Sequence, residues 1–178
     1  IKSKGYPMMG VSESKMEKVM RGSREGFADA LKCNTALVRK RIRSDKLKVK
    51  EKIIGTTTNT TVAIVYLEGL ARDSVLKEID RRLSKLQIEG MTDSGIIEQL
   101  TEESVFSPFP QYQTTERPDR AAMEVLNGRV VLFVDNTPVA LLLPTNYGNF
   151  FQTADDYYNR FHVVTFARII RYAAAMLA

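Results

Sequence analysis

The chain has 178 residues, which is enough for one domain of ordinary size with a substantial core. Apolar residues make up 44% of it and charged residues 26%, so the composition is that of a globular protein and excludes a disordered one. A single cysteine, Cys33, excludes an internal disulfide, and a single histidine, His162, argues against a multi-histidine metal site or histidine-based catalysis. We expect no metal and no other cofactor.

The net charge of +5 is unevenly distributed along the chain. Residues 1–52 carry 15 Lys/Arg and 6 Asp/Glu, a net +9, whereas residues 53–178 carry 11 and 15, a net −4. A basic half of this kind can face nucleic acid, an anionic membrane surface or an acidic protein, or it can be a solvated helix face. We expect no binding to nucleic acid, because only Tyr6 and Phe27 could stack on bases there.

The first predicted elements are a lead-in, a helix and two strands. Residues 1–22 show little apolar pattern and are interpreted as a lead-in segment. From Ser23, a possible helix cap followed by Glu25, apolar side chains recur at helical spacing and predict a long basic amphipathic helix over 23–44. Residues 48–57 alternate as a half-exposed strand does, and the apolar run 61–67 predicts a buried strand.

Helices dominate the predicted middle of the chain. Asp73 or Ser74 caps a helix whose apolar face continues to Leu86, and a further helix is expected over 92–100. After a proline-marked loop, residues 111–116 are interpreted as extended. A helix then begins at Pro118 and is ended by Asn127-Gly128.

The two most apolar runs of the chain, 130–134 and 139–143, are separated by Asp135-Asn136-Thr137-Pro138, which predicts a tight β-hairpin. Neither run alternates polar with apolar residues, so both faces of both strands should be covered. The predicted fold is therefore mixed α/β: a small, mostly buried sheet with a central hairpin, flanked by amphipathic helices, over residues 23–154.

The last segment, residues 155–178, predicts a helix that begins near Asp155 and becomes more apolar toward Ala178. We interpret it as a helix that leads toward a membrane span outside this chain, with Arg168 and Arg171 on the cytoplasmic side. The alternative is a C-terminal core helix.

Two charged motifs could bind a ligand or a partner. In the first, around Pro118, a cluster of ion pairs could fix a helix start, or Arg117 could hold a ligand carboxylate; the structural role is favoured. The second has two arginines and two glycines that could hold an anion, but it lacks the lysine and the spacing of a phosphate-binding loop. The candidate residues are Arg21, Arg24, Glu25, Glu116, Arg117 and Asp119.

The motifs, taken in order, resemble those of the GerA family of bacterial spore germination proteins, the A-type subunits of nutrient germinant receptors. The stretches that carry the resemblance include Arg21-Gly-Ser-Arg-Glu-Gly-Phe27, Thr115-Glu-Arg-Pro-Asp119, Gly128-Arg-Val-Val131 and Asp156-Tyr-Tyr158. The chain departs from the family at Ser23, where proline is common, and at Asn136, where glycine is common. Both are conservative changes at a helix start and a turn. SpoVAF-like paralogues share the same pattern.

The resemblance implies a non-enzymatic role. A-type subunits work with B-type and C-type partners in the inner spore membrane and are thought to oligomerise into a cation-conducting assembly. This region would be the second half of a soluble N-terminal domain on the core side, before the membrane spans, and would act in assembly and signal coupling. The alternative is a small-ligand-binding domain that senses a germinant directly, with Arg117 or Arg24 holding an anionic group.

Overall fold

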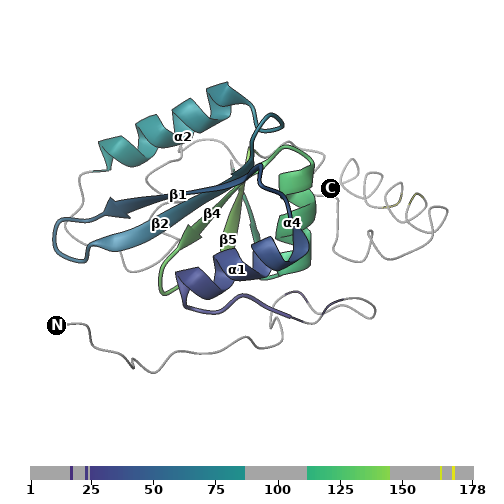
Figure 1. Ribbon diagram of the computed structural model, residues 1–178. Coiled ribbons are helices and arrows are strands. Elements are labelled where there is room, and N and C mark those ends of the chain that lie inside the picture. The colour runs from purple at the N-terminus through teal and green to yellow at the C-terminus, as the bar shows by residue number, and fades with distance from the viewer. Residues whose placement is uncertain are drawn as a thin grey trace.

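The computed structural model of the protein describes residues 17, 23, 25–86, 112–144, 165 and 170. Within them, a five-stranded sheet of order β1-β2-β4-β5-β3 is paired antiparallel throughout and packs against three helices (Figure 1). The elements are α1 (Leu31–Arg41), β1 (Leu47–Ile54), β2 (Thr60–Leu67), α2 (Asp73–Lys85), β3 (Gln113–Thr115), α4 (Pro118–Leu126), β4 (Val130–Val134) and β5 (Ala140–Leu143). The predicted mixed α/β fold is confirmed.

The hairpin of β4 and β5 lies inside the sheet, as predicted. β4 pairs with both β2 and β5, and all five of its residues are buried. The turn between the two strands places Asn136 at φ +67°, a left-handed conformation that asparagine tolerates better than most residues. A fully apolar strand therefore marks the centre of the sheet.

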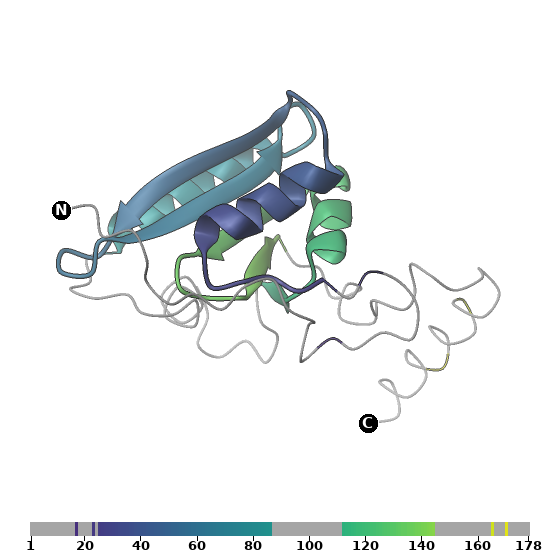
Figure 2. The same cartoon turned by 60° about the horizontal axis from the view of Figure 1, so that its bottom comes forward.

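Helices cover both faces of the sheet. α1 and α4 pack on one face and α2 on the other (Figures 1 and 2). On the first face the ring of Phe27 meets that of Phe133 edge-on, with centroids 4.8 Å apart. On the second face Ile79 and Leu83 of α2 pack against β2 and the central strands. Alternate residues of β2 thus enter two separate cores.

The first helix is shorter than predicted. The expected helix over 23–44 is wrong at its start, because α1 begins at Leu31 and Ala30 is extended. The buried side chain of Asn34 accepts a hydrogen bond from the backbone N–H of Ala28 (2.8 Å) and donates one to its carbonyl (2.6 Å). Asp135, from the hairpin turn, accepts a hydrogen bond from the N–H of Leu31 at 3.1 Å. These contacts hold the preceding chain extended, so neither Ser23 nor Glu25 is helical.

The other described elements agree with the prediction to within a few residues. α4 ends as expected just before Asn127-Gly128. Gly128 has a φ of +83°, and a Cβ added there would lie 2.9 Å from the carbonyl oxygen of Leu70. The lead-in apart from Glu17, the helix expected over 92–100 and most of residues 155–178 lie outside the described residues; Thr165 and Ile170 are both helical. No helix within the described part of the chain is long and apolar enough to cross a membrane.

Candidate functional site

The charged motif at the start of α4 is a buried ion pair. Arg117 occupies the position before the first turn and is only 1% exposed. Its Nε donates to Oδ1 of Asp119 at 3.0 Å, and its Nη2 contacts the second carboxylate oxygen. A two-point contact of this kind holds a guanidinium in place and compensates part of its desolvation. The ion pair expected at this helix start is present, and the ligand role of Arg117 stays a prediction.

Glu116 connects this motif to the segment before α1. Its backbone carbonyl accepts a hydrogen bond from the N–H of Phe27 at 2.8 Å. The chain around Phe27 is thereby held next to the start of α4, which explains why two motifs far apart in the sequence lie side by side. A binding role for the Glu116 side chain stays a prediction.

One further charged contact on α4 was not predicted. The carboxylate of Glu17 pairs with Nη1 of Arg120 and accepts a hydrogen bond from the Thr115 hydroxyl at 2.6 Å. The Arg120 side chain is 9% exposed and that of Glu17 19%. Because Glu17 and Arg120 are 103 positions apart, no local pattern could reveal the pair. The contact attaches the lead-in segment to α4.

A third arginine pair, also buried, lies at the other end of α4. Arg129 contacts Glu124 at 3.1 Å, Gln113 at 3.3 Å and the backbone carbonyl of Leu142 at 3.2 Å. The side chains of Arg129 and Glu124 are 9% and 6% exposed. These bonds join α4 to β3 and β5, so this arginine also serves the internal structure.

The anion site predicted around residues 21–26 is described only in part. Arg21 and Arg24 lie outside the described residues. Glu25 is engaged by the last turn of α1: it contacts Lys40 at 2.8 Å and Arg41 at 2.6 Å. Hydrogen bonds from Lys40 and then Arg41 lower the pKa of the Glu25 carboxyl below its usual range. Part of the basic charge of α1 is thus neutralised within the domain.

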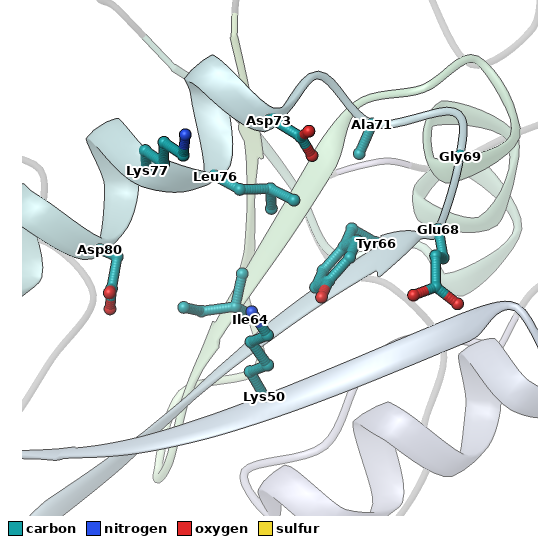
Figure 3. A pocket seen from close by; sticks show the side chains of 10 residues that line it. All are labelled: Lys50, Ile64, Tyr66, Glu68, Gly69, Ala71, Asp73, Leu76, Lys77 and Asp80. Atoms are coloured by element: carbon teal, nitrogen blue, oxygen red, sulfur yellow. The ribbon is translucent and has the colours of Figure 1, made fainter.

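A pocket that sequence reasoning missed lies between α2 and the strands β1 and β2 (Figure 3). Its volume is about 310 Å³. Six of the residues that line it are Lys50, Ile64, Tyr66, Asp73, Leu76 and Lys77. Lys50 and Ile64 are register partners across β1 and β2, so only the strand pairing places them together. The helical spacing of Asp73 and Lys77 was the one available signal, and it is also typical of an ordinary solvated face.

Nucleophile and metal chemistry find little support in the described part of the molecule. Cys33 is exposed on α1 and so is not a core residue. Within the described residues, no group of three or more histidine, cysteine, aspartate and glutamate side chains could hold a metal ion. His162 lies outside them.

Fold and site together define a mixed α/β domain whose buried arginines connect its own segments. The chain belongs to the GerA family of spore germination proteins, because the family model described as "Bacillus/Clostridium GerA spore germination protein" matches residues 1–178. The resemblance inferred from the motifs is confirmed.

Individual relatives agree with the family assignment. The chain is 41% identical to spore germination protein A1 of Bacillus subtilis (strain 168) over 167 residues, which are 94% of this chain and 35% of that protein. It is 38% identical to spore germination protein KA of the same organism over 169 residues, 95% of this chain and 31% of that protein. The chain therefore spans about a third of the length of these curated relatives.

A solved structure is also similar. It is the crystal structure of the N-terminal domain of the A subunit of the Bacillus megaterium spore germinant receptor GerK3. The two chains are 39% identical, the TM-score is 0.55, and the match covers 68% of this chain and 97% of the other. The fold described above is thus similar to that of a germinant receptor N-terminal domain.

Proposed function

We propose that this chain is a domain of an A-type germinant receptor subunit that acts in receptor assembly and in coupling nutrient sensing to ion release during spore germination. The family, the two named spore germination proteins and the receptor domain of similar fold support the role in germination. The domain acts without catalysis of its own. Its partners are B-type and C-type subunits and further copies of itself, at the inner spore membrane with this domain on the core side.

The attachment of Glu17 to α4 is the observation that carries the coupling role. Glu17 is bound by Arg120 and Thr115, at the start of α4 and the end of β3. α4 in turn packs on α1 and runs through Gly128 directly into the central hairpin. A displacement of the lead-in segment would therefore be transmitted to α4 and the centre of the sheet through this partly buried ion pair and the hydrogen bond beside it. A coupling domain needs such a rigid connection between the segments that enter it and its core.

The test uses spores that carry the full-length receptor with Glu17→Gln, which removes the charge and keeps the size. We expect cation release and loss of turbidity after nutrient addition to be slower, because the pair with Arg120 is lost. Glu51→Gln on β1 is the matched control, since Glu51 is exposed and makes no ion pair with a described residue. We expect the control spores to germinate normally.

Receptor abundance, measured by immunoblot of the A-type, B-type and C-type subunits, separates the two parts of the proposal. Slow germination at normal abundance supports coupling through the Glu17 contact. Loss of all three subunits together supports a role in assembly. Normal abundance with normal germination kinetics would overturn the proposed route through Glu17 and Arg120.

A further inference from the structure

The pocket under α2 contains a tyrosine hydroxyl that has no partner in the described part of the chain. Tyr66 is 7% exposed, and its ring points into the pocket beneath Leu76 (Figure 3). Its hydroxyl makes no hydrogen bond to any described residue. The hydroxyl is not one of the buried side-chain atoms that lack a hydrogen bond, so it is open to the space of the pocket and can bond to a molecule that enters it.

Two lysines at the same pocket form no direct ion pair with a described residue. The ammonium group of Lys50 lies over the Tyr66 ring, 5.6 Å from its centroid, and Lys77 extends from α2 at the rim (Figure 3). Neither makes an ion pair with a described residue. The positive charge of Lys77 is therefore available to an anion, and Lys50 interacts only at longer range with Asp80, whose pKa it helps to lower.

Three carboxylates line the pocket as well, and two of them are neutralised. Glu68 pairs with Lys48 at 3.2 Å, and Asp80 pairs with Lys52 at 2.8 Å. Asp73 is in the first turn of α2, where a negative charge is stabilised by the helix dipole. Lys50 and Lys77 therefore outnumber Asp73, the one carboxylate of the lining that has no ion pair with a described residue. The pocket thus favours an anion over a cation.

We propose that this pocket binds a small organic carboxylate with an apolar body. The carboxylate accepts a hydrogen bond from the Tyr66 hydroxyl and pairs with Lys50 and Lys77. The apolar body lies against Ile64, Leu76 and the tyrosine ring. The volume of about 310 Å³ is at the lower end of the range for small-molecule pockets, which sets the size of the ligand. This inference is independent of the coupling role, because the pocket is formed by α2 and the Glu17 contact is on α4.

The probes are three molecules of matched shape: benzoate, neutral benzamide and cationic benzylamine. Each is titrated into the 178-residue chain at constant ionic strength, and binding is followed by the shifts of assigned backbone amide resonances. We expect benzoate to give saturable shifts at residues of β1, β2 and α2 around the pocket, with a Kd of about 1 mM. Benzamide and benzylamine should bind at least about tenfold more weakly, because they do not complement the lysines.

Two substitutions test the proposed contacts. Tyr66→Phe keeps the ring and removes the hydroxyl, and should weaken benzoate binding about tenfold, as expected for a hydrogen bond to a charged group. Lys77→Gln should weaken it about threefold, as expected for an exposed charge. Lys32→Gln is the matched control, because Lys32 is exposed on α1 across the sheet and should leave the Kd unchanged.

Unchanged amide resonances in α1 and α4 would show that the variants are folded. Equal affinity for the three probes would overturn the proposal, as would benzoate binding that is insensitive to both Tyr66→Phe and Lys77→Gln. Benzoate shifts that do not saturate, or that spread over the surface, would overturn it too.

Discussion

α4 and α2 use charged residues in opposite ways. α4 has nine residues, of which six are buried, including Arg120 and Glu124. α2 has 13 residues, of which only Ile79 and Leu83 are buried, and its charged side chains stay at the surface. Charges buried with partners fix one arrangement of the chain, whereas accessible charges remain available to a ligand. The burial of a charged side chain in these two helices therefore indicates its role better than the charge itself.

The largest effect is expected where a buried charge loses its partner. Asp119→Ala leaves the guanidinium of Arg117 without the carboxylate that contacts it at two points. We expect the free energy of unfolding to fall by about 3–5 kcal/mol, measured by urea denaturation. Asp73→Ala removes the corresponding first-turn carboxylate of α2, which is exposed, and should lower the same quantity by about 0.3–1 kcal/mol. Equal losses in the two variants would contradict the contrast between the helices.

The next largest loss of stability is expected when a buried but uncharged side chain is removed. Asn34→Ala removes the side chain that bonds to both backbone groups of Ala28, within a buried part of the chain. Two unsatisfied backbone groups should lower the free energy of unfolding by about 2–4 kcal/mol. Thr35→Ala is the neighbouring control: its hydroxyl bond to the Lys32 carbonyl is exposed, so we expect a change below about 0.5 kcal/mol. Thermal denaturation of both variants measures the difference.

A smaller effect is expected from the hydrogen bond by which the hairpin turn fixes the start of α1. The carboxylate of Asp135 accepts a hydrogen bond from the N–H of Leu31, so a distant part of the chain caps α1. Asp135→Ala removes this cap. The expected loss is about 0.5–2 kcal/mol, as for a helix cap, measured by urea denaturation. Asn136→Gly relieves the left-handed conformation next to it and should leave stability unchanged or slightly higher. If Asp135→Ala has no effect, the start of α1 is not fixed by the turn.

The sequence predicted the elements that depend on local pattern. Val130 to Val134 and Thr61 to Leu67 are continuous apolar runs, and the start of α4 is marked by Pro118; each appears where it was expected. The start of α1 was not predictable, because a long-range bond from Asp135 helps to fix it and helical spacing continues before it. Local pattern determines which segments are helices or strands, and distant contacts determine where they begin.

The candidate sites show the same division. Arg117 and Asp119 are two residues apart, so their ion pair could be predicted from the sequence. Arg120 finds its partner Glu17 only through the fold. The pocket depends on the register that pairs Lys50 with Ile64, and on α2 crossing above them. A site formed by one segment of the chain can be predicted from the sequence, whereas a site formed by three separate segments cannot.

The smallest expected effect concerns the ion pairs of Glu25 with Lys40 and Arg41, which lie at the surface on the α1 side. Lys40→Met removes the contact that contributes most to the lowered pKa, so the pKa of Glu25 should rise toward its usual value of 4.5 in a carboxyl-detected NMR titration. The pKa is lower in the folded state. The stabilisation is therefore fully present above pH 4.5 and is lost as the pH falls through the folded-state value.

The free energy involved should be below about 1 kcal/mol, because the Glu25 side chain is 35% exposed and solvent screens the pair. Lys46→Met is the control, since Lys46 is exposed and makes no ion pair with a described residue. It should leave the Glu25 titration unchanged. An unshifted Glu25 pKa in both variants would mean that Lys40 does not hold this carboxylate in solution. Arg41 would then be the residue of α1 that pairs with Glu25, and the accessible charge of Lys40 would resemble that of Lys77 on α2.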